Sequence, residues 1–139
     1  MNVYASIPSL IALVKSASGV SIDSRDELKN KVFWALKGPR FDANDFVEDV
    51  LEAGALHVVS DDDRWHGHHK MSVVEDSLDA LQRVAQGVRR TWSCPVLALT
   101  GSNGKTTTKE LIRDVLATTF RVHATTGNLN NHIGVHSPS

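Results

Sequence analysis

A glycine-rich segment near the C-terminal end of the sequence, Thr100-Gly-Ser-Asn-Gly-Lys-Thr-Thr-Thr108, has the residue types of a phosphate-binding loop. Its small residues allow successive backbone N–H groups to converge on one anion. A helix that begins at its end would add a partial positive charge there. The ammonium group of Lys105 would bind the β- and γ-phosphates of a nucleotide, and the hydroxyl group of Thr106 would bind Mg²⁺. We therefore expect a nucleotide site made of Gly101, Ser102, Asn103, Gly104, Lys105, Thr106 and Thr107.

The alternative for this segment is a turn that merely joins a strand to a helix. Turn chemistry alone does not explain Gly-Lys-Thr between a buried strand and a helix, so we favour the phosphate loop. The general pattern has a further glycine where this sequence has Leu99, so the loop is a shorter variant. It is not a dinucleotide-binding fingerprint either, since G-x-G-x-x-G is absent from it.

Three other polar groups could bind a ligand. In Asp23-Ser24-Arg25 the guanidinium group can pair with a phosphate and the hydroxyl group can donate to one. A capped turn with a surface arginine is the alternative. The loop over 37–44 and the block Gly127-Asn-Leu-Asn-Asn131 read as ordinary turns on residue types alone, although asparagine amides both donate and accept.

The elements that position these groups alternate between strands and helices. Apolar runs predict strands over 20–22, 32–36, 55–60, 71–75, 96–100 and 120–124. Helical spacing predicts helices over 8–17, 46–54, 77–88 and 105–118. This order indicates an α/β fold with parallel strands. The last strand–helix–strand unit cannot cover both faces of its own sheet, so we expect either that it docks on the first domain or that the chain is a truncated piece of a larger protein.

Composition excludes several classes of protein. With 139 residues, 41% of them hydrophobic and 22% charged, the chain can form a core and is not disordered. Lys and Arg number 15 against 16 acidic residues, which argues against binding nucleic acid through bulk charge. No segment predicts a membrane span or a signal peptide, so we expect a cytoplasmic protein. The single Cys94 is expected to be a small buried residue, and the histidines of loop 61–70 a solvated cluster rather than a metal site.

Three blocks, in order, resemble the Mur ligases. They are Asp23-Ser-Arg25 together with Phe33-Trp-Ala-Leu-Lys-Gly-Pro-Arg-Phe-Asp-Ala-Asn-Asp-Phe46, then Thr100–Glu110, and then Thr126-Gly-Asn-Leu-Asn-Asn-His-Ile-Gly-Val135. The resemblance covers nearly the whole chain and is greatest to the members that add D-alanyl-D-alanine to UDP-N-acetylmuramoyl-tripeptide. The phosphate loop alone would also fit sister ligases and folylpolyglutamate synthases. After Gly134-Val135 the family has a proline where this sequence has His136.

The resemblance implies a fold, an activity and further site residues. It implies a small N-terminal α/β domain over 1–80 that binds the UDP substrate, a connecting helix or linker over 81–94, and over 95–139 the truncated first strand–loop–helix–strand unit of a parallel-sheet ATPase domain. It implies an ATP- and Mg²⁺-dependent ligase of peptidoglycan synthesis that works through an acyl phosphate, with no nucleic-acid or membrane partner, acting as a monomer. Lys105 would be catalytic and Thr106 a metal ligand. The UDP-substrate site would contain Asp23, Ser24, Arg25, Lys37, Gly38, Asp42, Asn128 and Asn131.

Two alternatives remain at this point. One is another Mur ligase, which adds a single amino acid. The other is a nucleotide-binding module without ligase activity, against which the Gly-Asn-Leu-Asn-Asn block argues because a phosphate loop alone does not need it. The resemblance also implies that further catalytic groups lie beyond Ser139, so we expect the 139-residue chain to be inactive by itself.

Overall fold

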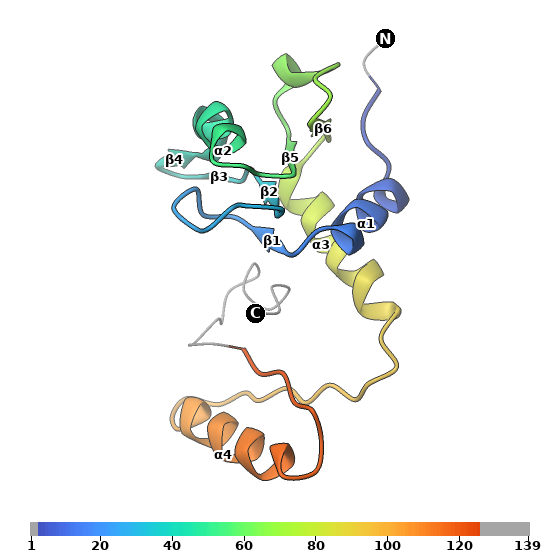
Figure 1. The fold of residues 1–139 in the computed structure, drawn as a ribbon. Coiled ribbons are helices and arrows are strands. Elements are labelled where there is room, and N and C mark those ends of the chain that lie inside the picture. The colour runs from blue at the N-terminus through green and yellow to red at the C-terminus, as the bar shows by residue number, and fades with distance from the viewer. Residues whose placement is uncertain (1–2, 126–139) are drawn as a thin grey trace. The chain divides into compact units, whose positions relative to one another are not determined.

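The protein divides into two compact units, 1–91 and 92–139. The computed structural model describes residues 3–125 (Figure 1). The first unit contains every strand among the described residues. The second contains one helix within its described part. The α/β class predicted from the sequence is confirmed by this mixture of helices and parallel strands.

A four-stranded parallel sheet forms the centre of the first unit. Its strands are β1 (Val20–Ser21), β2 (Val32–Trp34), β5 (His57–Ser60) and β6 (Met71–Val73), in the spatial order β1-β2-β5-β6. All four lie within strands predicted from the sequence, although each is shorter than predicted. Because the strands are parallel, their carboxyl ends meet at one edge of the sheet, which is where ligands bind in open α/β folds.

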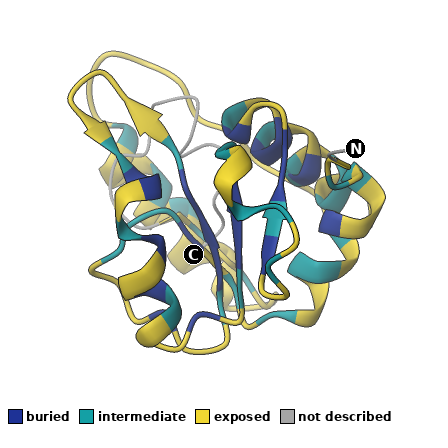
Figure 2. Cartoon of the chain, turned by 90° about the horizontal axis from the view of Figure 1, so that it is seen from above, coloured by how far each residue is buried: buried dark blue, intermediate teal, exposed yellow. Residues whose placement is uncertain are grey.

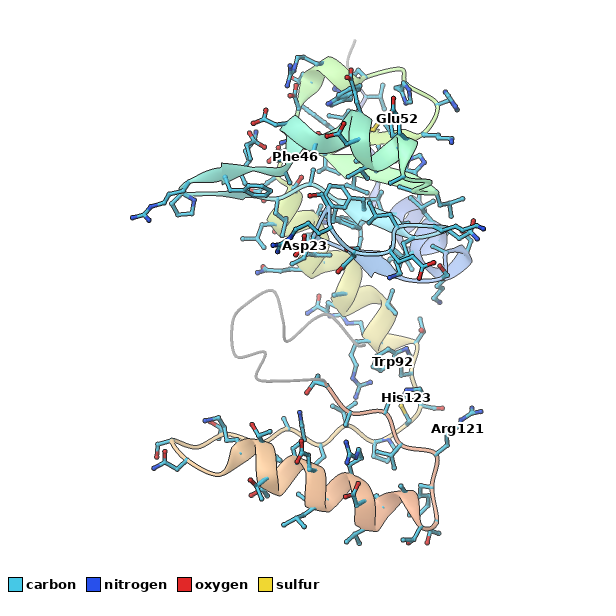
Figure 3. The ribbon with its side chains drawn as sticks, turned by 60° about the vertical axis from the view of Figure 1, so that its left-hand side comes forward. Asp23, Phe46, Glu52, Trp92, Arg121 and His123 are labelled. Carbon is cyan, nitrogen blue, oxygen red and sulfur yellow. The ribbon has the colours of Figure 1, made fainter. Side chains whose placement is uncertain are left out.

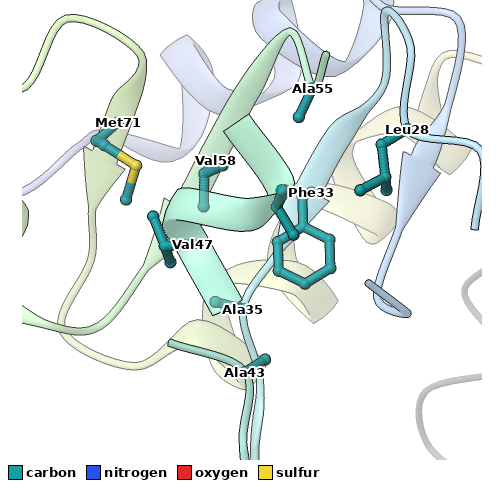
Figure 4. Close-up of a cluster of buried hydrophobic side chains, with 9 residues drawn as sticks. Leu28, Phe33, Ala35, Ala43, Val47, Ala55, Val58 and Met71 are labelled. Atoms are coloured by element: carbon teal, nitrogen blue, oxygen red, sulfur yellow. The ribbon is translucent and has the colours of Figure 1, made fainter. Parts of the chain in front are cut away.

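Both faces of the sheet are buried, and accordingly β2 is wholly apolar and β5 has two buried valines at its centre. Phe33, Ala35 and Val58 belong to a cluster on the face covered by α2 (Val47–Glu52), shown in Figure 4. Trp34 alternates to the opposite face and is fully buried, and its indole Nε1 donates to the carbonyl oxygen of Ser77 at 2.7 Å. Figure 2 shows buried residues along the central strands and on the helices that cover them.

Two helices lie side by side in the first unit, α1 (Ile7–Ser16) and α3 (Ser77–Arg90) (Figure 1). The side chain of Ser6 caps α1 and that of Asp76 caps α3, each by accepting a backbone N–H of the first turn. The helices approach closely at Gly87, where an added Cβ would lie 2.3 Å from the Cδ1 atom of Ile11. A glycine therefore permits this contact, although it lowers helix propensity.

The predicted loop over 37–44 is partly ordered as a hairpin. Its strands β3 (Lys37–Gly38) and β4 (Phe41–Asp42) pair antiparallel and form a separate two-stranded sheet. The 3-10 turn η1 (Ala43–Phe46) follows, and it ends at Phe46, which Figure 3 labels. The rings of Phe41 and Phe46 stack with centroids 5.4 Å apart. The turn residues Pro39 and Arg40 obscure so short a pairing in the sequence. A second 3-10 turn, η2 (Asp63–Trp65), follows β5.

The second unit contains α4 (Lys105–Ala117), as predicted, but the expected strands over 96–100 and 120–124 are not formed. A strand requires a hydrogen-bonded neighbour, and the sheet found among the described residues lies wholly in the first unit. The apolar side chains of this unit are correspondingly exposed, among them Leu97, Val115 and Phe120, which are 65%, 69% and 64% exposed. Within the part described, therefore, the second unit does not bury an apolar core.

The segment between the units differs from one expectation. Cys94, predicted to be buried, is exposed, because the apolar elements predicted on either side of it do not pack over it. The division of the chain between the two units falls after Thr91, so the buried residues of α3 belong to the first unit. The predicted limits of the functional domains, at 80, 94 and 95, stay a prediction. Over residues 3–125 no helix has the length and apolar content needed to cross a membrane.

Candidate functional site

The carboxyl edge of the sheet carries six of the residues predicted to bind the UDP substrate. Asp23, Ser24 and Arg25 follow β1, whereas Lys37, Gly38 and Asp42 lie on the hairpin that follows β2. Since β1 and β2 are neighbours and parallel, both groups lie beyond the same edge. The structure therefore gathers two separated sequence blocks at the position where a parallel sheet presents ligands.

Asp23 and Arg25 form an ion pair through two side-chain hydrogen bonds. The Nε and Nη2 atoms of Arg25 donate to the two carboxylate oxygens of Asp23 at 2.8 and 2.6 Å, and the backbone N–H of Arg25 donates to Oδ1 at 3.0 Å. These donors lower the pKa of Asp23 to about 2, chiefly through the side-chain hydrogen bonds. The side chain of Arg25 is 87% exposed, so its guanidinium group remains open to a ligand while Asp23 orients it.

Lys37 is held by a carboxylate that the sequence did not single out. Its Nζ atom lies 2.9 Å from Oδ1 of Asp61, the residue directly after β5. This hydrogen bond raises the pKa of Lys37 above its usual value. The side chain of Lys37 is 49% exposed, and an ammonium group has three N–H donors, so a ligand can bind without displacing Asp61.

Asn44 connects the carboxylates around Lys37. Its Nδ2 atom donates to Oδ1 of Asp42 at 2.8 Å and to Oδ1 of Asp61 at 3.1 Å, and its Oδ1 atom accepts the hydroxyl of Ser60 at 2.6 Å. Asn44 and Ser60 are 3% and 0% exposed. Sequence analysis missed Asn44, Ser60 and Asp61, because burial of an asparagine in a polar loop has no signature in the residue order.

Asp62 and Arg64 form a second ion pair of the same kind. Arg64 donates through Nε and Nη2 to Oδ2 of Asp62 at 2.8 and 2.6 Å, and these bonds lower the pKa of Asp62. In both ion pairs the backbone N–H of the aspartate donates to the hydroxyl of the serine two residues earlier, which is the last residue of a parallel strand. The shared spacing, Ser-x-Asp-x-Arg at 21–25 and 60–64, is a signal that sequence analysis could have used.

The phosphate loop of the second unit has the backbone geometry that an anion site requires. Gly104, the residue before α4, has φ of 77° and Gly101 has φ of 150°, and the first turn of α4 has no side-chain cap. Its leading N–H groups therefore point out of the helix toward the loop. Ser102, Asn103, Thr106 and Thr107 are exposed around it. The assignment of these residues to a nucleotide site stays a prediction.

Lys105 and Lys109 lie one turn apart on α4 and are its half-buried residues over 105–110. The ammonium group of Lys105 donates to the carbonyl oxygen of Gly101, across the phosphate loop. That of Lys109 donates to the carbonyl oxygen of Thr125. Thr125 directly precedes the block that contains Asn128 and Asn131, which lie outside the described residues. Their predicted contact with the substrate therefore stays a prediction.

The donor set of the loop fits the Mg²⁺ that accompanies a nucleotide. Thr106 occupies the second position of α4 and is exposed at the uncapped end of the helix. A hydroxyl group there can bind a hard cation together with phosphate oxygens, which is the coordination Mg²⁺ accepts. Over residues 3–125 no group of three or more histidine, cysteine or acidic side chains is placed to hold a metal ion.

Comparison with known proteins agrees with this geometry. Residues 99–138 match the model of the Mur ligase middle domain. The chain is 44% identical over 119 residues to the UDP-N-acetylmuramoyl-tripeptide--D-alanyl-D-alanine ligase of Bacillus subtilis, and 40% identical over 118 residues to that of Escherichia coli. These alignments cover 84% of this chain but 26% and 25% of the relatives. The chain thus spans about a quarter of the length of these curated relatives.

Solved structures give the same result. A crystal structure of MurF from Acinetobacter baumannii aligns with a TM-score of 0.76 and 30% identity, over 97% of this chain and 32% of its own. The Thermotoga maritima MurF ligase in complex with ADP aligns with a TM-score of 0.71 and 33% identity, over 85% of this chain and 27% of its own. The chain belongs to the Mur ligase family. Within that family, the two sequence relatives carry the name of the ligase that adds D-alanyl-D-alanine, as the sequence blocks predict, and the two solved structures carry the name MurF.

Proposed function

We propose that this chain provides the UDP-substrate site and the ATP phosphate loop of a ligase that joins D-alanyl-D-alanine to UDP-N-acetylmuramoyl-tripeptide. The observation that carries the proposal is the uncapped, glycine-bounded start of α4 with Lys105 beside it. The chain that contains it is similar in sequence to UDP-N-acetylmuramoyl-tripeptide--D-alanyl-D-alanine ligases and in structure to MurF. The names of the relatives support the choice of substrates.

The proposed reaction has two steps. The terminal carboxylate of the tripeptide first attacks the γ-phosphorus of ATP, forming an acyl phosphate and releasing ADP. The amine of D-alanyl-D-alanine then attacks the acyl carbon, inorganic phosphate leaves and the amine loses a proton. A carboxylate is a poor electrophile, and phosphorylation converts its oxygen into a leaving group.

Positioning and charge neutralisation are the roles of this chain in that reaction. The N–H groups at the start of α4 and the ammonium group of Lys105 bind the phosphates, for which Lys105 exchanges the Gly101 carbonyl for a phosphate oxygen. Thr106 would hold Mg²⁺, which when bound neutralises the phosphate charge. In the first unit, Arg25 and Lys37 donate to the uridine nucleotide, oriented by Asp23 and Asp61.

The proposal is tested with the longest gene product that contains this chain. It is incubated with UDP-N-acetylmuramoyl-tripeptide, ATP, Mg²⁺ and either D-alanyl-D-alanine or single amino acids, and the uridine product is weighed by mass spectrometry. The proposal expects a mass gain of one D-alanyl-D-alanine less water, together with release of phosphate. A gain of one single amino acid would assign the protein to a sister ligase, and ATP binding without any mass gain would support a nucleotide-binding module.

A further inference from the structure

Asn44 is a buried polar residue at an otherwise exposed edge. It is 3% exposed, whereas Lys37, Gly38 and Phe41 of the adjoining hairpin are exposed. Burial of an amide is costly unless each of its polar atoms has a partner. Both amide protons and the amide oxygen of Asn44 have one, through Asp42, Asp61 and Ser60. The network is therefore complete.

The partners of Asn44 come from segments that are far apart in sequence. Asp42 lies on β4, directly opposite Lys37 in the hairpin pairing. Ser60 is the last residue of β5, and Asp61 follows it. The amide therefore joins the hairpin that follows β2 to the end of β5. It does so within the carboxyl edge, on the side where the sheet presents its ligand.

Asp61 connects Asn44 to Lys37. One of its oxygens, Oδ1, accepts both the amide of Asn44 at 3.1 Å and the ammonium group of Lys37 at 2.9 Å. Without Asn44 that carboxylate would have its orientation fixed by the lysine alone, and a half-exposed lysine is a flexible partner. A fixed Asp61 leaves the other two N–H groups of Lys37 in a constant direction.

We propose that Asn44 is a positioning residue, whose buried amide orients Asp61 so that Lys37 is held toward an acceptor group on the ligand. The inference rests on the proposed function in one respect, namely that the ligand at this edge is a uridine nucleotide. Asn44 itself does not touch the ligand. It acts through Asp61, and its effect on binding therefore requires Lys37.

The first test needs no ligand. The ammonium pKa of Lys37 is measured by NMR in the 139-residue chain, in Asn44→Ala, in Asp61→Asn and in the double variant. We expect the pKa to fall in each single variant and to fall no further in the double variant than in Asp61→Asn. A Lys37 pKa that is unchanged in Asn44→Ala would overturn the proposal. Asn44→Ser, which retains a small polar group, replaces Asn44→Ala should that variant fail to fold.

The second test measures binding of uridine diphosphate by calorimetry. Loss of one oriented hydrogen bond weakens binding about fivefold, so Asn44→Ala is expected to raise Kd by about that factor. In a Lys37→Met background the same substitution is expected to leave Kd unchanged. A fivefold loss that persists without Lys37 would show a general structural role and overturn the proposal. If the unsubstituted chain does not bind uridine diphosphate, the proposed function fails, and the Lys37 pKa still decides whether Asn44 positions that lysine.

Discussion

Replacement of Arg25 by alanine should remove a large part of the affinity for the UDP substrate and leave the fold intact. Arg25 has five N–H groups, of which Asp23 accepts one from Nε and one from Nη2. Three therefore remain for a phosphate, enough for one or two charge-assisted hydrogen bonds. Loss of these bonds corresponds to a Kd about tenfold to a hundredfold higher.

The stability of the fold should not change, because the side chain of Arg25 is 87% exposed and therefore buries little surface. Calorimetric titration of UDP-N-acetylmuramoyl-tripeptide into the chain measures the affinity, and thermal unfolding monitors the fold. Arg83→Ala is the matched control, since Arg83 also pairs with an aspartate, Asp79, on the exposed surface of α3. Arg25→Lys restores the charge without the planar fork and should recover only part of the affinity. Equal Kd values for Arg25→Ala and the unsubstituted chain would refute the assignment of this site.

Three further predictions follow from the packing and the charges. Lys105→Ala should abolish ATP binding without lowering the melting temperature, because Lys105 contacts the loop rather than a core; a large drop in melting temperature would show a structural lysine. Gly87→Ala should destabilise the chain by less than about 1 kcal/mol, because the half-buried Ile11 can turn its Cδ1 atom away and alanine gains helix propensity, and it should become stabilising in an Ile11→Val background when measured by urea unfolding. Burial lowers the pKa of His57 below 6.5, so the unfolded chain binds its proton at higher pH than the folded chain. The free energy of unfolding should therefore fall as the pH drops through 6.5, and His57→Gln should reduce this dependence.

Periodicity and composition predicted the first unit well because its strands are buried on both faces. The run around Phe33 is apolar without interruption, and the run around Val58 is interrupted only by His57, which is close to the pattern of a parallel sheet between helices. The hairpin at 37–42 was not predicted, since its two-residue strands depend on tertiary contacts such as the stack of Phe41 on Phe46.

The same reasoning predicted two strands in the second unit that the structure does not contain over 96–100 and 120–124. The residues over 96–100 have the apolar composition of a buried strand. Such a pattern shows which residue types are present, but not whether a neighbouring strand is available to pair with them. A strand also requires a neighbour, and none pairs with this segment in the described part of the second unit. The helix α4 was predicted correctly because its hydrogen bonds are internal.

In the candidate site, residue types were enough to propose which groups bind a ligand, but not to find the residues that hold those groups in place. Arg25 and Lys37 could be proposed because guanidinium and ammonium groups bind phosphates and other acceptors. Asp61 and Asn44 could not, since their roles depend on the approach of β5 to the hairpin. Such partners become visible only when the strands have been placed side by side.

The most direct test of the account is a map of backbone amide shifts in the isotope-labelled 139-residue chain. UDP-N-acetylmuramoyl-tripeptide should shift amides over 23–25, 37–44 and 60–64, at the carboxyl edge of the sheet, and Mg²⁺ with ATP should shift those over 101–107. Both responses should saturate with ligand concentration. Shifts from the uridine ligand that fall instead at the opposite edge of the sheet, or the absence of any saturable shift with either ligand, would contradict the account.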